Sequence, residues 1–361
     1  MQSVRGVPVI VGLSGGVDSA VAALRLVRAG AEVQALYMEN WDGDDEYCTS
    51  AQDYQDARAV ARELGIVLHR VNFTAAYRER VFADFLAGYA AGQTPNPDVL
   101  CNREIKFGLC TAYARRLGGR LFATGHYARL RTDSDGPALL KAVDPDKDQS
   151  YFLHAVPRSE FTGVLFPLGE LFKPQVREMA REAGLPVCSK PDSTGICFIG
   201  ERPFADFLAR YLPENPGAIE TLAGERVGTH RGLHFYTLGQ REGLMIGGAA
   251  GYAPEPWYVV GKEPQRNILR VAQRHERAAL ETRRLRTTAS NWLAVRREGI
   301  WPATVKIRYR QPDQGVSVQT LPDDHLELRF DQPQRAATVG QYAVLYDGER
   351  CLGGAQIAET R

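Results

Sequence analysis

The chain has 361 residues, and domains of about 100–200 residues predict two or three of them. With 44 Lys and Arg residues against 43 Asp and Glu residues, the net charge is +1, so any contact with RNA must use local basic patches. The sequence has no apolar run of the roughly 18 residues that a membrane-spanning helix needs, and its six cysteines include no CxxC pair. These features exclude a membrane span, a disulfide scaffold and a four-thiolate zinc site, so we expect a cytosolic protein with free thiols.

The first part of the chain alternates strand and helix patterns. We expect strands at residues 7–12, 32–38, 66–72 and 121–124, with helices at residues 19–29 and 51–64. This order predicts an α/β fold with a doubly wound parallel sheet, whose ligand site lies at the carboxyl ends of the strands.

The second part of the chain differs in composition and in hydrophobic pattern. A helix is expected at residues 172–184, with Pro174 in its first turn and Gly184 at its end. Glycine and proline become frequent beyond about residue 203. From about residue 284 apolar and polar residues alternate, which predicts strands at residues 304–310, 326–330, 343–346 and 351–357. Several short strands separated by turns indicate a small barrel or sandwich.

A glycine-rich string stands between the first expected strand and the first expected helix. It reads Gly12-Leu13-Ser14-Gly15-Gly16-Val17-Asp18-Ser19. Successive glycines let backbone N–H groups converge on an anion, and the positive end of the helix adds to the attraction. The string lacks the GK[ST] ending of a Walker A loop. A plain glycine-rich turn capped by Asp18 is the alternative.

Two further strings contain cysteines. The first is Thr94-Pro95-Asn96-Pro97-Asp98-Val99-Leu100-Cys101-Asn102. A helix that starts near Asp98 would place Asp98 and Cys101 on one side, as a base and a thiolate nucleophile require. The second is Asp192-Ser193-Thr194-Gly195-Ile196-Cys197-Phe198-Ile199-Gly200, in which two glycines flank Cys197. Taken singly, each cysteine is more often structural than catalytic.

The glycine-rich string resembles the signature loop of the PP-loop ATP pyrophosphatases, which adenylate an acceptor and release pyrophosphate. Taken together, the three strings resemble those of the bacterial tRNA-specific 2-thiouridylases. Further strings of that family include Ala123-Thr124-Gly125-His126-Tyr127, Lys147-Asp148-Gln149-Ser150-Tyr151-Phe152-Leu153 and Arg308-Tyr309-Arg310-Gln311. The resemblance covers essentially the whole chain. One departure is Glu39, where many relatives are expected to have a basic residue.

The resemblance implies a role for each matching residue. The string from Gly12 to Ser19 binds the phosphates of ATP with Mg²⁺, and no metal is held by the protein alone. Met38 and Gly125 line the nucleotide pocket. The remaining implied roles are base contact for Asn96, Pro97 and Asp98, nucleophile for Cys101, persulfide carrier for Cys197, and tRNA contact for Lys147, Asp148, Gln149, Arg308 and Tyr309.

The resemblance also implies the reaction and its partners. ATP adenylates the C2 oxygen of the wobble uridine, with Asp98 as the base, and a persulfide on Cys197 then supplies sulfur, which leaves a Cys101–Cys197 disulfide. The partners are the anticodon stem-loop of tRNA and a persulfide sulfur donor, with no membrane and a monomeric enzyme. The expected domains are a PP-loop catalytic domain at residues 1–203, a central tRNA-contacting domain at residues 204–283 and a C-terminal β-barrel at residues 284–361.

Three alternatives remain open. Cys101 and Cys197, with or without Asp98, could hold an iron–sulfur cluster instead of passing a persulfide. The chain could be a different PP-loop adenylating enzyme, or an RNA-binding module with a degenerate nucleotide site.

The remaining cysteines are expected to be ordinary core or surface residues: Cys48, Cys110, Cys188 and Cys351. His126 is expected to orient the nucleotide loop or to pack locally, and the acidic stretch at residues 42–46 to form a solvated loop.

Overall fold

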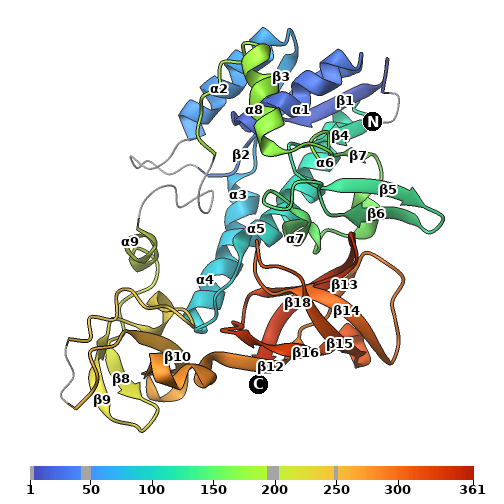
Figure 1. Cartoon of the computed structure of the whole chain (residues 1–361). Coiled ribbons are helices and arrows are strands. Elements are labelled where there is room, and N and C mark those ends of the chain that lie inside the picture. The colour runs from blue at the N-terminus through green and yellow to red at the C-terminus, as the bar shows by residue number, and fades with distance from the viewer. Residues whose placement is uncertain (1–3, 42–49, 193–202, 248–250) are drawn as a thin grey trace.

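A computed structural model describes residues 4–41, 50–192, 203–247 and 251–361 of the chain. An α/β part contains the N-terminus, and two parts rich in strands lie below it (Figure 1).

The α/β part is built on a five-stranded parallel sheet, as the sequence predicts. Its strands stand in the order β3-β2-β1-β4-β7. Their bounds are β1 (Pro8–Gly12), β2 (Glu32–Glu39), β3 (Val67–Asn72), β4 (Leu121–Ala123) and β7 (Val164–Leu165). The strand order reverses between the neighbours β1 and β4, so the crevice expected for a ligand lies at their carboxyl ends.

Helices cover both faces of this sheet. Successive residues of a strand point to opposite faces, so one strand can contribute apolar side chains to two cores. Val9 and Val11 pack into the larger core, whereas Ile10 packs into the smaller core on the other face. The larger core includes residues of α1 (Val17–Arg28), α2 (Ser50–Glu63) and α8 (Lys173–Glu182). The smaller core includes residues of α6 (Thr111–Arg116). The doubly wound arrangement is therefore confirmed.

The connection from β3 to β4 is a long run of helices that descends from the sheet (Figure 1). Its members are α3 (Thr74–Tyr77), a π-helix (Arg78–Phe82), α4 (Ala83–Ala90), α5 (Pro97–Leu100), a π-helix (Cys101–Cys110) and α6. π-Helical stretches are rare in proteins, but those that do occur are frequently found at functional sites. This connection contains both Asp98 and Cys101, which places the expected chemistry on a helical element.

The central part contains a four-stranded sheet in the order β10-β11-β8-β9. Its bounds are β8 (Gly217–Thr221), β9 (Arg226–His230), β10 (Trp257–Glu263) and β11 (Ile268–Gln273), preceded by α9 (Phe204–Ala209). Its own core includes Ile219, Trp257 and Val259, so this sheet packs independently of the parallel sheet.

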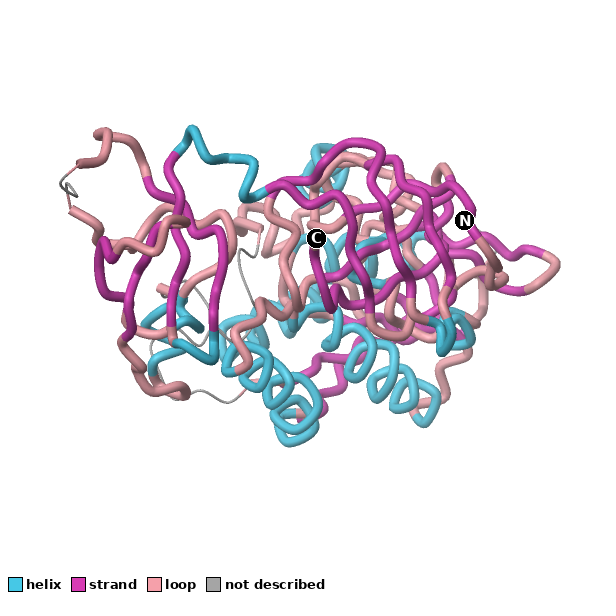
Figure 2. The backbone as a smooth tube through the Cα atoms, turned by 90° about the horizontal axis from the view of Figure 1, so that it is seen from below, coloured by secondary structure: helices cyan, strands magenta, loops and turns pink. Residues whose placement is uncertain are grey.

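The C-terminal part is a closed antiparallel barrel, which confirms the expected fold class. Its strands run β12-β16-β15-β14-β17-β18, and β18 pairs back onto β12. The bounds are β12 (Glu281–Thr287), β14 (Ile300–Lys306), β15 (Gln314–Thr320), β16 (Leu326–Arg335), β17 (Tyr342–Asp347) and β18 (Arg350–Thr360). Figure 2 shows the barrel beside the four-stranded sheet.

A hairpin from the first part of the chain extends the barrel sheet. The hairpin is formed by β5 (Arg129–Asp133) and β6 (Gly136–Leu140), and Leu140 of β6 pairs with Arg350 of β18. The sequence pattern did not reveal this pairing. The remaining elements are α7 (Ser150–Leu153), β13 (Asn291–Trp292) and 3₁₀ helices at Arg158–Phe161, Leu233–Phe235, Pro264–Arg266, Arg274–Leu280 and Pro322–Asp324. The domain boundaries after residues 203 and 283 stay predictions.

The expected strand at residues 304–310 is wrong in its second half. β14 ends at Lys306, and Arg310 has a φ of 63°, which belongs to a turn. The apolar alternation continues past the end of the strand because Ile307 is still buried and Tyr309 packs on Phe152, with ring centroids 4.5 Å apart. Alternation alone could not separate a strand from a turn with buried side chains.

Candidate active site

The glycine-rich string forms the loop between β1 and α1, at the carboxyl edge where the strand order reverses. Inside this phosphate loop (residues 12–19) the hydroxyls of Ser14 and Ser19 lie 3.1 Å apart. Ser19 Oγ also accepts from Ser14 N at 3.1 Å and donates to the carbonyl of Gly16 at 3.0 Å. The loop is thus shaped by its own hydroxyls at the N-terminus of a 12-residue helix, the geometry that attracts an anion.

Gly15 is required by the packing behind this loop. Its φ is +78°, and a Cβ atom there would lie 2.2 Å from the carbonyl oxygen of Asp53. Lys190 ties the same two residues together, because its ammonium donates to Gly15 O at 3.1 Å and to Asp53 Oδ1 at 2.7 Å. The back of the loop is therefore closed against α2.

Asp18 does not cap α1, which argues against a plain capped turn. Its Oδ1 accepts hydrogen bonds from the hydroxyl of Tyr127 at 2.8 Å and from the ammonium of Lys173 at 2.7 Å. The two donors come from the segment after β4 and from the start of α8. Asp18 thus joins the loop to two neighbouring elements.

Met38 and Gly125 flank the loop at the same edge of the sheet. Met38 lies near the end of β2, and Gly125 follows β4. A Cβ atom at Gly125 would lie 2.7 Å from the backbone nitrogen of Ser19, so only glycine lets the segment after β4 approach α1 so closely. These positions agree with the expected nucleotide pocket, although their contact with ATP stays a prediction.

His126 packs locally. Its Nδ1 lies 2.8 Å from the hydroxyl of Thr124, and its ring lies against those of Phe107 and Phe166. Burial lowers the pKa of His126 well below its ordinary value, with the charge of Lys106 acting in the same direction, so the ring is neutral at pH 7.

Asp98 and Cys101 lie on one continuous helical run that starts where the sequence suggests. Pro97 opens α5, and the side chain of Asn96 caps it by accepting from the backbone nitrogen of Asp98 at 3.2 Å. Asp98 and Cys101 are three residues apart, so they share a side of the helix. Burial raises the pKa of Asp98 above its ordinary value, although the charge of Lys106 partly opposes this shift.

Cys101 is 4% exposed and belongs to an apolar cluster that also contains Trp41 and Phe207. Phe207 lies on α9, which begins at Phe204. Cys197 lies outside the described residues, as does Cys48. The described residues stop at Asp192, beside the phosphate loop, and resume at Pro203. Pro203 stands just before α9, the helix that contributes Phe207 to the apolar cluster of Cys101.

Asp192 is surrounded by cations, which the sequence pattern did not reveal. Its carboxylate accepts from Lys147 at 2.5 Å, from Lys173 at 2.8 Å and from Arg177. Burial alone would raise the pKa of Asp192, but the hydrogen bonds from Lys147 and Lys173 bring it well below its ordinary value. The spacing of Lys173 and Arg177 places them one turn apart on α8, but only the tertiary fold shows which strand ends they face.

The expected tRNA contacts around residue 148 differ in their exposure. Lys147 is bound to Asp192, and Gln149 accepts from the backbone nitrogen of Tyr127 at 2.9 Å. Asp148 is 4% exposed and accepts from Ser150 Oγ at 3.0 Å. Asp148 therefore supports this segment from inside, and contact of these residues with tRNA stays a prediction.

Arg308 and Tyr309 lie in the turn after β14. The guanidinium of Arg308 donates to the carbonyl of Arg335 at 3.2 Å and to that of Ala336. Alternation along the strand expected at residues 304–310 would place Lys306 on one basic face with Arg308 and Arg310, but the side chain of Lys306 is largely buried and lies 3.5 Å from Asp148. The expected strand face of Lys306, Arg308 and Arg310 is therefore wrong, because the chain turns after Lys306.

The described cysteines outside this site match the expectation of ordinary residues. Cys110 and Cys351 are fully buried, and burial raises the pKa of Cys351 to about 12. Cys188 is half-buried. Among the residues that the structure describes, no group of three His, Cys, Asp or Glu side chains is arranged to hold a metal ion. The described helices also include none that is long and apolar enough to cross a bilayer.

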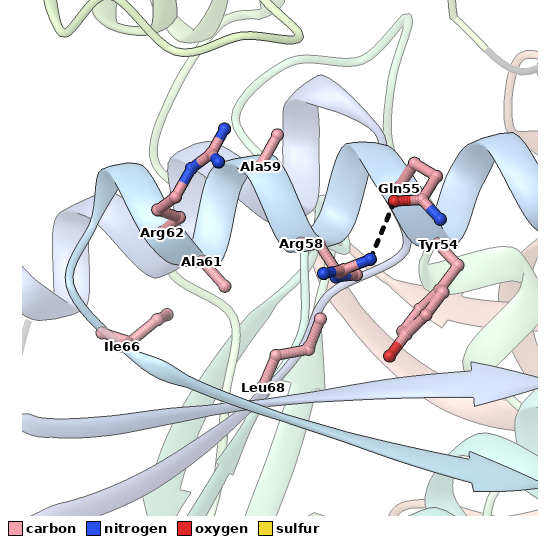
Figure 3. A pocket seen from close by; sticks show the side chains of 8 residues that line it. All are labelled: Tyr54, Gln55, Arg58, Ala59, Ala61, Arg62, Ile66 and Leu68. Atoms are coloured by element: carbon pink, nitrogen blue, oxygen red, sulfur yellow. Dashed lines mark hydrogen bonds between the residues drawn. The ribbon is translucent and has the colours of Figure 1, made fainter.

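Two cavities lie away from the phosphate loop. One of about 390 Å³ lies between α2 and β3, where Tyr54, Arg58 and Leu68 face it (Figure 3). Another, of about 440 Å³, lies between α4 and the barrel and reaches Asn96 and Leu100. Neither is lined by residues of the phosphate loop, so neither marks the nucleotide site.

Three family models match successive parts of the chain. Residues 7–201 match a tRNA methyl transferase HUP domain, residues 205–273 a tRNA methyl transferase PRC-barrel domain, and residues 282–357 an aminomethyltransferase β-barrel domain. The first match alone spans more than half of the chain.

Whole-length relatives are similar to this chain. A tRNA-specific 2-thiouridylase MnmA from Chromohalobacter salexigens is 52% identical over 359 residues, which is 98% of this chain and 92% of that protein. The protein of the same name from Alcanivorax borkumensis is 52% identical over 356 residues, covering 98% and 97% of the two chains. Among solved structures, the U34-tRNA thiolase NcsA from Methanococcus maripaludis is 18% identical with a TM-score of 0.37, over 54% of this chain and 63% of that chain.

Proposed function

Because the chain belongs to the tRNA-specific 2-thiouridylases, we propose that it uses ATP to replace the C2 oxygen of the wobble uridine of tRNA with sulfur. The observation that carries this proposal is the combination of two features in one molecule. A phosphate loop closed behind by Lys190 stands at the switch point of the sheet, and a capped helix presents Asp98 and Cys101 on one side.

The first step activates the uracil. The C2 oxygen attacks the α-phosphorus of ATP, pyrophosphate leaves, and the oxygen becomes part of an AMP ester, which is a good leaving group. Ser14, Ser19 and the N-terminus of α1 stabilise the charge of the departing phosphates. This placement agrees with the position of Gly125, whose lack of a side chain lets the segment after β4 pack against Ser19 of the loop.

Asp98 takes the N3 proton of the uracil in this step. Its raised pKa makes the carboxylate a stronger base than an exposed aspartate. Asn96 positions Asp98 by capping its helix. The target base must leave its stack to reach this helix, which suits an unpaired anticodon loop.

Sulfur transfer then uses two thiols. A sulfur donor converts Cys197 into a persulfide, and the outer sulfur attacks C2 and expels AMP. The thiolate of Cys101 attacks the inner sulfur, so that the thiocarbonyl is released and a Cys101–Cys197 disulfide forms. In the other route Cys101 attacks the persulfide first and frees hydrosulfide. Either route oxidises the two cysteines, and a reductant must reopen the disulfide.

The residues present fit ATP with Mg²⁺. The positive φ of Gly15 and the paired serine hydroxyls form a cradle for phosphate, and Asp18 provides a carboxylate beside it. Mg²⁺ typically needs only one or two carboxylates together with substrate phosphates and water. When bound, Mg²⁺ supplies Lewis-acid stabilisation of the phosphate charge.

We extend the proposal to the arrangement of the whole chain. Residues 1–203 perform catalysis, whereas residues 204–283 and the barrel at residues 284–361 hold tRNA, through Arg308 and Tyr309 in the barrel and Lys147, Asp148 and Gln149 in the catalytic part. The enzyme acts as a monomer.

The test measures pyrophosphate release from ATP with and without tRNA, together with mass analysis of the tRNA nucleosides for 2-thiouridine. We expect tRNA-dependent release, and Ser14→Ala is expected to abolish thiolation while filter binding of tRNA stays within about twofold of wild type. A nucleoside analysis that shows a methylated uridine and no 2-thiouridine would refute the proposal.

A further inference from the structure

The cations around Asp192 form an arrangement that is typical of an anion site. Lys147 approaches Oδ2 of Asp192 at 2.5 Å, while Lys173 approaches Oδ1 at 2.8 Å and Arg177 contacts the same oxygen. Two ammonium groups and one guanidinium around a single anion match the way proteins bind phosphate. In this structure the anion between the three cations is the carboxylate of Asp192.

This cation cluster (Lys147, Lys173 and Arg177) adjoins the phosphate loop. The ammonium of Lys173 also lies 2.7 Å from Oδ1 of Asp18, so one side chain touches both Asp192 and the loop. The loop itself, residues 12–19, contains no Lys or Arg. Positive side chains for a triphosphate must therefore come from outside the loop, and the cluster lies within one side chain of it.

We propose that the cation cluster is a polyphosphate subsite next to the phosphate loop, and that Asp192 fills it until the phosphates of ATP or the pyrophosphate product replace the carboxylate. The inference deepens the proposed function and rests on it for the identity of the ligand. It assigns Lys173 and Arg177, which no sequence pattern singled out, to the binding of the leaving pyrophosphate.

The charges favour such an exchange. Three cations face the carboxylates of Asp18 and Asp192, and the carboxylate of Asp144 accepts from the backbone nitrogen of Lys173 at 2.8 Å, so these charges balance only while Asp192 stays in place. A phosphate group carries more charge and more acceptor oxygens than the carboxylate that it displaces. The depressed pKa of Asp192 shows that the cluster already stabilises an anion strongly. Since Asp192 and phosphate use the same donors, each weakens the binding of the other.

The experiment is calorimetric titration of the full-length protein with pyrophosphate and Mg²⁺, without tRNA. Lys173→Met and Arg177→Gln are each expected to weaken pyrophosphate binding about tenfold, the usual effect of losing one charge-assisted hydrogen bond. Asp192→Asn is expected to strengthen binding several-fold, because it removes the competitor; a gain of affinity cannot result from misfolding. Lys173→Arg keeps the charge and is expected to retain most of the affinity.

Arg181 provides the matched control. It lies one turn beyond Arg177 on α8, is exposed and pairs with Glu178. Arg181→Gln removes the same charge from the same helix and is expected to leave pyrophosphate affinity unchanged.

The subsite is overturned if Lys173→Met and Arg177→Gln bind pyrophosphate as wild type does, or if Asp192→Asn gains nothing. Release of pyrophosphate from ATP with tRNA is measured in parallel. If the wild type releases pyrophosphate in a tRNA-dependent way but the variants bind pyrophosphate as the wild type does, only the subsite is refuted. If the variants change pyrophosphate binding as expected but the wild type shows no tRNA-dependent release, only the proposed function is refuted.

Discussion

The hydroxyl of Tyr127, a side chain that is only 2% exposed, donates a hydrogen bond of 2.8 Å to Oδ1 of Asp18 in the phosphate loop. Tyr127 follows Gly125 after β4, and Asp18 lies in the first turn of α1 after β1, so this bond joins the segments that follow the two strands between which the sheet order reverses.

Tyr127→Phe is expected to lower the free energy of unfolding by about 1.5 kcal/mol, the lower end of the net value of a hydrogen bond to a charged group. Because Asp18 keeps its bond to Lys173, the loop should stay folded, and KM for ATP should rise only a few-fold. Urea denaturation and steady-state kinetics test both parts. An unchanged unfolding free energy would show that the bond contributes nothing.

Gly15→Ala is expected to abolish tRNA-dependent pyrophosphate release, since the added Cβ would lie 2.2 Å from Asp53 O. Gly118→Ala is the matched control: Gly118 also has a positive φ, +87°, but nothing lies within 4 Å of its Cβ position. The control should lose about 1 kcal/mol of stability from backbone strain and keep its activity. Equal activity of the two variants would remove the steric argument for the loop.

Asp98→Asn is expected to abolish thiolation and to raise the melting temperature at pH 7. Burial raises the pKa of Asp98 above its ordinary value of 3.8, so the ionised carboxylate is less stable in the fold than in the unfolded chain. The stability that protonated Asp98 contributes is complete below pH 3.8 and is lost as the pH rises through the higher folded-state pKa. The melting temperatures of wild type and Asp98→Asn, compared across pH, measure this loss.

The activity of the wild type should follow the same ionisation. If Asp98 is the base, kcat/KM rises with pH along an acidic limb that lies above the ordinary pKa of an aspartate. A limb at or below pH 3.8, or residual pH-dependent turnover by Asp98→Asn, would assign the proton transfer to another group.

Arg308→Ala is expected to weaken tRNA binding and to lower the salt dependence of log K by about one unit of slope, the effect of one lost phosphate contact. Arg308→Lys keeps the charge and should keep the salt slope, although it loses the guanidinium group that donates a hydrogen bond to Arg335 O. Binding at several salt concentrations separates the two. Loss of affinity by Arg308→Ala with an unchanged slope would mean that Arg308 only supports the barrel turn.

The local patterns of this sequence predict the parallel sheet well. The strand β1 has a continuous apolar run and β2 has one from Ala35 to Met38, and Asn96 with Pro97 marks the start of α5 by ordinary capping chemistry. The glycine-rich string could be placed at the carboxyl end of a strand because a strand precedes it and a helix follows, whereas the reversal of strand order beside it is known only from the structure.

Features that depend on long-range contacts could not be predicted in this way. The pairing of Leu140 with Arg350 joins residues 210 positions apart (350 − 140), and no local pattern specifies it. The convergence of Lys147 and Lys173 on Asp192 likewise depends on how α8 packs. The end of β14 at Lys306 was missed because burial of Ile307 imitates a continuing strand.

Replacing each cysteine singly separates the roles proposed for Cys101 and Cys197. Cys101→Ser and Cys197→Ser are both expected to stop turnover, but only Cys197→Ser should prevent persulfide loading from the donor, as measured by mass spectrometry of the alkylated protein. The reason is that sulfur enters at Cys197, while Cys101, 4% exposed within an apolar cluster, acts only when the substrate is in place. The rival is an iron–sulfur cluster held by both cysteines. Anaerobic purification, iron analysis and absorption spectroscopy test it, and a stoichiometric cluster that activity requires would overturn the persulfide route.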